Sequence, residues 1–163
     1  MDNNDVAVMD IAQTVAHEMI EREWKLGTVE CGVDGVVSHY IFETEDGPTV
    51  LGFSLVTGDL QEAIELLNLP RPQFRNAGDF SLKAARAAAR AGLAFLGVHF
   101  CMTAWAEEFT LDETERRPVH LAVATSREVL DETIYIEGEE GEREVAAKQI
   151  VVAVLRMAQD LLV

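Results

Sequence analysis

Three segments between residues 98 and 137 constrain the fold most strongly, because each alternates apolar and polar side chains over the length of a strand. They cover residues 98–106, 118–125 and 130–137. No helical segment separates them, and strands connected in this way pair antiparallel. The sequence therefore predicts a three-stranded antiparallel meander.

A second β-rich region lies nearer the N-terminus. Its two runs, 36–44 and 49–56, flank the sequence Glu-Asp-Gly-Pro at 45–48. Asp-Gly between two such runs is typical of a β-hairpin. We therefore expect an N-terminal hairpin beside the meander.

Four other segments repeat apolar residues with helical spacing: 5–25, 60–68, 80–96 and 143–162. Asp59 is placed to cap the second of these helices, and Asp79 or Ser81 to cap the third. The order of elements predicts an α+β fold, a two-layer domain in which three or four helices cover a mostly antiparallel sheet.

The length of the chain, 163 residues, suits a single domain over residues 1–163, since no internal repeat or linker divides it. No apolar run approaches the roughly 18 residues that a membrane span requires. The acidic N-terminus lacks the basic start of a secretory signal. We therefore expect a cytoplasmic protein that does not bind membranes, located in the bacterial host cell if a phage encodes it.

The charge of the chain is unevenly distributed. The formal net charge is −16, but residues 107–142 carry −9 and residues 70–106 carry +4. A field of this sign repels nucleic acid and anionic membranes and attracts basic surfaces. Direct binding of nucleic acid is therefore not expected.

Two acidic segments follow the first and third strands of the meander, and alternate connections of a meander lie at one end of the sheet. Their carboxylates are Glu107, Glu108, Asp112, Glu113, Glu115, Glu137, Glu139, Glu140 and Glu142. We interpret them as a surface that binds a basic protein partner, or as a mimic of nucleic-acid charge. A pair of solvated loops is the alternative, and a calcium site would lack the EF-hand order of ligands.

A basic stripe is predicted on the helix over 80–96. Lys83, Arg86 and Arg90 are spaced i, i+3 and i+7 and so share one face. The stripe suits an anion, or an acidic patch on a second copy of the chain, which would produce a homo-oligomer. A solvated helix face is the alternative interpretation.

Signals for catalysis are weak. His39, His99 and His120 lie in predicted strands, and Cys101 shares a face with His99, so a metal site or a Cys–His pair is one hypothesis. No spacing supports it, and the sequence contains no Gly-x-Ser-x-Gly, P-loop or dinucleotide motif. We therefore assign no catalytic residue, metal or cofactor, and we favour binding over catalysis.

The segment AWAEEFTLDETERRPVHLAVATSREVLDETIYIEG resembles small phage-encoded proteins of unassigned function, over about a fifth of the chain. The resemblance carries no site residues and favours a viral or mobile-element origin. Three functions are therefore expected. The first is an acidic inhibitor of a basic partner, of counter-defence or nucleic-acid-mimic type. The alternatives are a structural protein assembled through an acidic patch and the basic helix, and a metal-dependent or Cys/His hydrolase.

Overall fold

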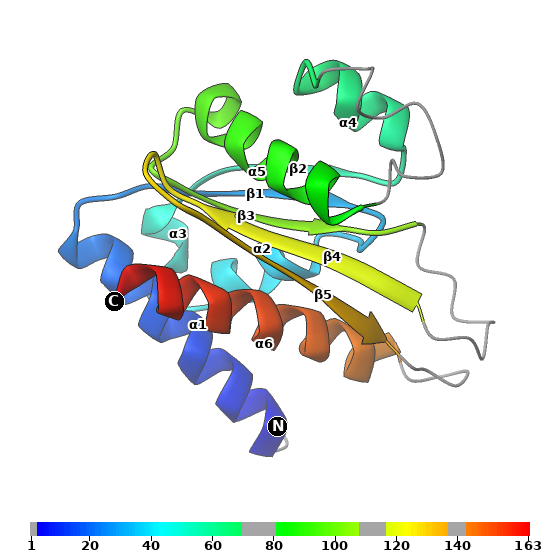
Figure 1. Ribbon diagram of the computed structural model, residues 1–163. Helices are drawn as coiled ribbons and strands as arrows, with labels where there is room; N and C mark the ends of the chain where they lie inside the picture. The colour runs from blue at the N-terminus through cyan, green and yellow to red at the C-terminus, as the bar shows by residue number, and fades with distance from the viewer. Residues whose placement is uncertain (1–2, 70–80, 108–116, 137–142) are drawn as a thin grey trace.

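The computed structural model describes residues 3–69, 81–107, 117–136 and 143–163. Within these residues the chain forms an α+β fold, as the sequence predicted, with helices packed on a five-stranded sheet (Figure 1). The strands lie in the order β2-β1-β3-β4-β5. Their bounds are β1 Leu26–Cys31, β2 Leu51–Thr57, β3 Phe100–Trp105, β4 Arg117–Ala124 and β5 Val129–Ile136.

The sheet is mixed. β1 pairs parallel with β2 on one side and with β3 on the other, while β3–β4 and β4–β5 are antiparallel. The predicted meander is confirmed as β3, β4 and β5. The sheet is less antiparallel than expected, because the N-terminal part of the chain contributes parallel strands.

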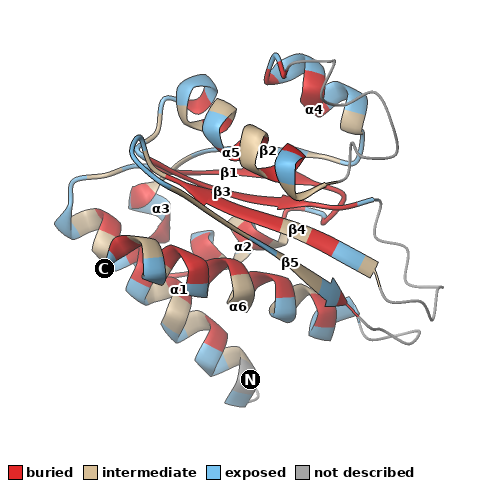
Figure 2. Cartoon of the chain, viewed as in Figure 1, coloured by how far each residue is buried: buried red, intermediate tan, exposed pale blue. Residues whose placement is uncertain are grey.

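Helices lie on both faces of the sheet (Figure 1). Their bounds are α1 Asn3–Glu21, α2 Val36–Phe42, α3 Gly47–Val50, α4 Leu60–Leu66, α5 Leu82–Leu96 and α6 Arg143–Leu162. α1 and α6, with the short α2 and α3, cover one face, and α5 and α4 cover the other. The strands β1 and β3 between these layers are buried along their whole length (Figure 2).

The N-terminal hairpin is the main error of the sequence-based prediction. Residues 36–42 form α2 instead of a strand, and β2 is parallel to β1, a strand that was not predicted. Valine and isoleucine in this segment favour a strand locally. However, Val37 and Ile41 stand four residues apart and are both buried, so they form the core-facing side of a helix. Packing therefore decides this conformation against local propensity.

The four predicted helices are confirmed as α1, α4, α5 and α6. The carboxylate of Asp59 accepts hydrogen bonds from the N–H groups of Gln61 and Glu62, and the Ser81 hydroxyl accepts one from Ala84 N–H. These are N-caps that the sequence indicated. Local signals therefore determine where α4 and α5 begin.

The face of α5 that meets the sheet consists largely of small residues: Ala84, Ala85, Ala88, Ala89 and Gly92. A Cβ atom at Gly92 would lie 2.7 Å from Cys101 Sγ and 2.9 Å from Val29 Cγ2. Glycine at this position therefore allows α5 to lie close to β1 and β3.

Replacing Gly92 with alanine tests this contact. The added methyl group overpacks the interface, and we expect the free energy of unfolding to fall by about 1–3 kcal/mol, even though alanine favours the helix. Urea denaturation followed by circular dichroism measures the change. Gly58→Ala is the matched control, because no described atom lies within 4 Å of a Cβ at Gly58. Equal losses in the two variants would contradict close packing at Gly92.

Candidate functional site

The C-terminal ends of three parallel strands, β2, β1 and β3, meet at one edge of the sheet. β1 continues into α2 on one face, whereas β2 continues into α4 on the opposite face (Figure 1). Adjacent strands whose connections leave to opposite faces form a switch point, and ligands of α/β sheets bind at such points. The candidate site is therefore the edge between β1 and β2.

Glu30, near the end of β1, is a buried carboxylate with only 1% of its surface exposed. Its Oε1 accepts a hydrogen bond from Val37 N–H at 2.7 Å, and its Oε2 accepts one from Ser38 N–H at 3.1 Å. The Thr28 hydroxyl donates to the same Oε2 at 3.2 Å. Glu30 therefore caps α2 from the neighbouring strand, since the N-cap residue of that helix, Gly35, has no side chain to do so. Burial raises the pKa of Glu30, and the hydrogen bonds from α2 oppose that rise.

The loop between β1 and α2 turns in a small space. Gly32, Asp34 and Gly35 all adopt left-handed backbone conformations, with φ of 77°, 57° and 71°. Gly32 N–H donates to Thr57 O at the end of β2, and a Cβ at Gly32 would lie 2.1 Å from Ala106 O after β3. The loop is thus held between the ends of β2 and β3, and its first position requires glycine.

A hydroxyl group organises the end of β2. Thr57 Oγ1 accepts a hydrogen bond from Asp59 N–H at 3.0 Å and donates one to Glu62 Oε2 at 3.0 Å. The Asp59 carboxylate in turn caps α4. Both helices that leave the switch point, α2 and α4, therefore begin at a carboxylate of the chain itself.

Cys31, the last residue of β1, is buried beside Asp59. Burial, and to a smaller extent the negative charge of Asp59, raises the pKa of the thiol to about 11. The thiol stays protonated at neutral pH. Because the thiolate is the nucleophilic form, Cys31 is inert in the native protein.

Hydrogen-bond acceptors dominate the described rim of the site. Asp34, Asp59 and Glu107 are exposed carboxylates, and Arg143 at the start of α6 forms an ion pair with Asp34. A helix N-terminus normally attracts phosphate, but α2 and α4 already carry Glu30 and Asp59 there. The arrangement therefore suits a ligand that donates hydrogen bonds or carries positive charge.

The acidic surface predicted from the sequence lies mostly outside the described residues. Glu107 is described, and it is exposed directly after β3. The residues outside the description are Glu108, Asp112, Glu113, Glu115, Glu137, Glu139, Glu140 and Glu142. β3 and β5 do end at the same edge of the sheet, as expected. That this surface binds a basic protein remains a prediction.

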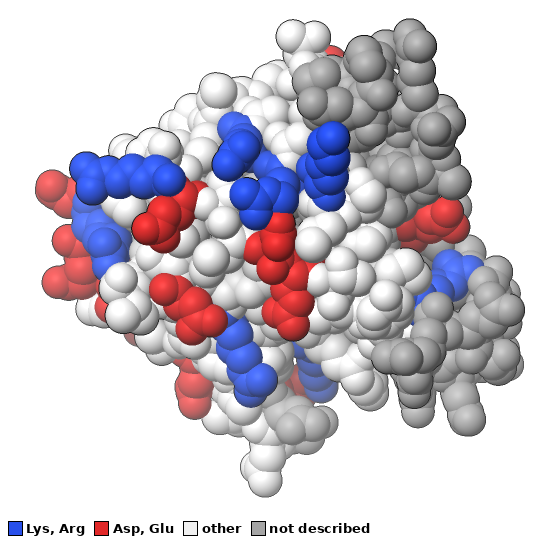
Figure 3. All heavy atoms as spheres, viewed as in Figure 1, with Lys and Arg blue, Asp and Glu red and all other residues white. Residues whose placement is uncertain are grey.

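The basic stripe lies on the outer side of α5, where Figure 3 shows Lys and Arg side chains above neighbouring acidic ones. Lys83 and Arg90 are exposed. Arg86 is partly buried, and its Nη1 lies 2.6 Å from Asp131 Oδ2 of β5. Arg86, the middle residue of the basic stripe, thus forms an ion pair within the chain. Binding of an anion or of a second copy through this stripe remains a prediction.

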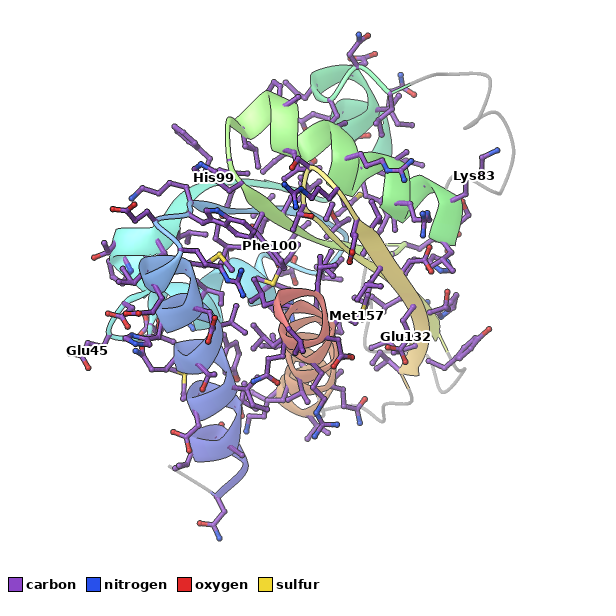
Figure 4. All side chains as sticks on the ribbon, turned by 60° about the vertical axis from the view of Figure 1, so that its left-hand side comes forward. Glu45, Lys83, His99, Phe100, Glu132 and Met157 are labelled. Atoms are coloured by element: carbon purple, nitrogen blue, oxygen red, sulfur yellow. The ribbon has the colours of Figure 1, made fainter. Side chains whose placement is uncertain are left out.

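His99 lies far from the candidate site, at the start of β3 beside Phe100 (Figure 4). Its Nδ1 accepts a hydrogen bond from Lys25 N–H at 2.9 Å. Its ring stacks on Trp24 with the ring centroids 6.2 Å apart. His99 therefore joins the N-terminal ends of β1 and β3.

The other residues of the predicted Cys–His group are also separated. His120 Nδ1 lies 2.8 Å from Thr133 Oγ1 of β5, and His39 is exposed on α2. Cys101 is buried under α5, and burial raises the pKa of its thiol to about 12. Among the residues that the structure describes, no group of three or more His, Cys, Asp or Glu side chains is placed to hold a metal ion. Because His39, His99, His120 and Cys101 have these separate surroundings, the expectation of a metal-dependent or Cys/His hydrolase built on them is wrong.

The described helices include two long ones, α1 with 19 residues and α6 with 20. Neither these nor the other described helices are long and apolar enough to cross a membrane. That the chain forms a single domain remains a prediction.

The residues that define the candidate site were not predicted from the sequence. Glu30 lies within the apolar run LGTVEC, where nothing local distinguishes it from a solvent-facing strand residue. The available signal is the pair of glycines at 32 and 35, which follow a β-rich run. Two glycines so placed are typical of a tight turn from a strand into a helix.

Comparison with known proteins found no matching family model and no matching curated protein. Solved structures do match. A competence-damaged protein (CinA) superfamily protein from Escherichia coli is 16% identical, with a TM-score of 0.81 over 99% of this chain and 93% of that chain. The competence/damage inducible protein CihA from Agrobacterium tumefaciens is 17% identical, with a TM-score of 0.81 over 99% and 97% of the two chains. A CinA superfamily protein from Enterobacter cloacae is 14% identical, with a TM-score of 0.82 over 96% and 92%.

At this level of identity the likeness shows a shared fold. It nevertheless corrects the functions expected from charge. The matching structures are competence-damage proteins of the CinA superfamily, and they cover nearly the whole chain. The expectation of a phage-encoded inhibitor or nucleic-acid mimic is therefore wrong, and the structural-protein alternative has no counterpart among these matches.

Replacing Glu30 with glutamine tests the cap on α2. The side-chain amide of glutamine has one oxygen and one NH2 group, so it can accept a hydrogen bond from only one of the two N–H groups, those of Val37 and Ser38. The other N–H group loses its buried hydrogen bond. We therefore expect the free energy of unfolding to fall by roughly 1–3 kcal/mol. Glu43→Gln is the matched control, because Glu43 is exposed at the other end of the same helix. Urea denaturation measures both. A Glu30→Gln variant as stable as the control would show that the cap contributes nothing.

The two thiols provide an independent check on burial at this edge and under α5. With a pKa of about 11 for Cys31 and about 12 for Cys101, at most on the order of one thiol in a thousand is ionised near pH 8. We expect neither to react with Ellman's reagent in the native protein and both to react after unfolding in urea. Rapid reaction of one equivalent in the native state would contradict the buried position.

Proposed function

We propose that this chain is a CinA-type domain that binds a small molecule at the switch point between β1 and β2. The fold shared with the CinA-superfamily structures supports the first part of this proposal. The observation that carries the second part is the buried carboxylate of Glu30, which caps α2 and fixes the loop after β1.

Two features of the structure around Glu30 lower the stability of the folded chain. Burial of an ionisable group opposes folding, and Asp34 adopts a φ of 57°, which residues other than glycine rarely adopt. Costs of this kind concentrate at binding and catalytic sites. This supports the edge between β1 and β2 as the place where a ligand binds.

The chemistry of the described residues favours a ligand that donates hydrogen bonds, such as an amine, an amidine or a hydroxyl compound. Asp34, Asp59 and Glu107 supply carboxylates at the rim. Glu30 and Asp59 occupy the N-termini of α2 and α4, so neither helix offers its first N–H groups to a phosphate.

We infer that the protein acts in the cytoplasm. Its two cysteines, Cys31 and Cys101, are free and buried, which suits a compartment where disulfides do not form.

A titration followed by backbone NMR tests the ligand class. Arginine amide, with a guanidinium and an amine, is the cationic probe, and inorganic phosphate is the anionic one, both at physiological ionic strength. We expect arginine amide to shift the amide resonances of Gly32, Gly35 and Gly58, and we expect phosphate to leave them unchanged.

A double variant, Asp34→Asn with Asp59→Asn, removes two rim charges and preserves the local structure. Asparagine tolerates the left-handed conformation and is a good N-cap. We expect arginine amide to bind about tenfold more weakly to this variant. The matched control changes Asp10 and Asp160, which are exposed on α1 and α6, to asparagine. Phosphate-induced shifts at Gly32 and Gly35, or equal weakening in both double variants, would contradict the proposal.

A further inference from the structure

β2 forms one outer edge of the sheet, and we propose that this edge joins two copies of the chain. The two β2 strands run antiparallel across a two-fold axis at Ser54 and make one continuous sheet. This interface differs from the charged surfaces expected from the sequence, and it does not depend on the proposed ligand site.

The β2 edge is uncharged in a strongly acidic chain. Residues 47–58 contain no Asp, Glu, Lys or Arg, although the net charge of the chain is −16. The opposite edge strand, β5, carries Asp131 and Glu132. Edge strands usually avoid pairing by means of charged residues or prolines, and the segment Leu51–Thr57 contains neither. Because acidic copies repel one another, an uncharged edge is the surface through which they can approach.

Apolar side chains are exposed along this edge. Phe53 is 64% exposed and Val56 is 46% exposed. The register pairs Phe53 with Gly27 and Leu55 with Val29, so both face the α5 side of the sheet. An exposed aromatic residue beside an uncharged strand edge is typical of a protein–protein interface.

The backbone of β2 also has groups directed outward. Thr57 C=O accepts a hydrogen bond from Gly32 N–H, so the peptide groups of Thr57 face inward. Alternate residues of a strand turn their N–H and C=O groups to the same side. Those of Val56 and Ser54 therefore face away from β1. An antiparallel strand centred on Ser54 pairs this residue with its own copy through two hydrogen bonds.

The same register makes the side chains complementary. Phe53 of one copy stands opposite Leu55 of the second copy, at positions where the side chains of antiparallel strands lie closest. The two-fold axis repeats this contact. The interface thus contains two apolar pairs, each of Phe53 against Leu55 of the other copy.

Mass measurement by light scattering tests the proposal. We expect the full chain to be a dimer at micromolar concentration. Phe53→Lys places a charge against Leu55 of the second copy, twice per dimer, and should raise the dissociation constant at least about tenfold. Tyr135→Lys makes the same kind of change at an exposed aromatic residue of β5 and should leave the dimer intact. A monomeric wild type, or a dimer that survives Phe53→Lys, overturns the proposal.

Cysteine cross-linking tests the register by the formation of a covalent bond. Ser54→Cys places two thiols in a pair whose Cα atoms lie about 5.5 Å apart, within the range of a disulfide. We expect this variant to form a covalent dimer on oxidation. Val56→Cys, on the same strand, separates its two Cα atoms by roughly 14 Å and should remain uncross-linked. Cys31 and Cys101 are buried. Equal cross-linking of the two variants, or none in Ser54→Cys, overturns the proposed pairing.

Discussion

The hydrogen bonds from the first turn of α2 to the carboxylate of Glu30 hold the switch point in place. Without this acceptor, the N–H groups of Val37 and Ser38 would lose their partners in the interior, at a cost of about 1–3 kcal/mol each. Because β1 supplies the acceptor, the loop after β1 needs no capping side chain and is short enough to lie between the ends of β2 and β3. The position of α2 and the exposure of Asp34 at the edge both follow from this contact.

The surroundings of β1 explain why an acidic residue serves as an internal cap. β1 has parallel neighbours on both sides and helices on both faces, so its side chains are buried along its whole length. On the α5 face this burial requires small residues, and Gly92 lets the helix approach Val29 closely. On the other face the helix that follows β1 begins directly over Glu30. A carboxylate there is removed from water but meets N–H donors from α2.

How much of this structure was predictable depends on where the determining contacts lie. Alternation and helical spacing are local patterns, and they predicted the meander and four helices correctly. The N-caps of α4 and α5, Asp59 and Ser81, accept hydrogen bonds from backbone N–H groups two or three residues further along the chain. α2 was missed because its decisive contact comes from Glu30 on another element, while its own residues favour a strand. Glu30 was missed for the same reason, since its role requires a strand covered on both faces.

The positions of the strands change how the acidic segments of the chain are interpreted. The sequence drew attention to carboxylates after β3 and β5, and these strands end at the edge where β1 and β2 also end. Of the carboxylates in these two segments, the structure describes Glu107, which is exposed just after β3, at the edge that also carries Asp34 and Asp59. The matching structures share the fold at 14–17% identity, and a fold alone does not decide which ligand is bound. On the proposed function, the ligand is selected by the side chains described at this edge, Asp34, Asp59 and Glu107, whose charge favours a cation.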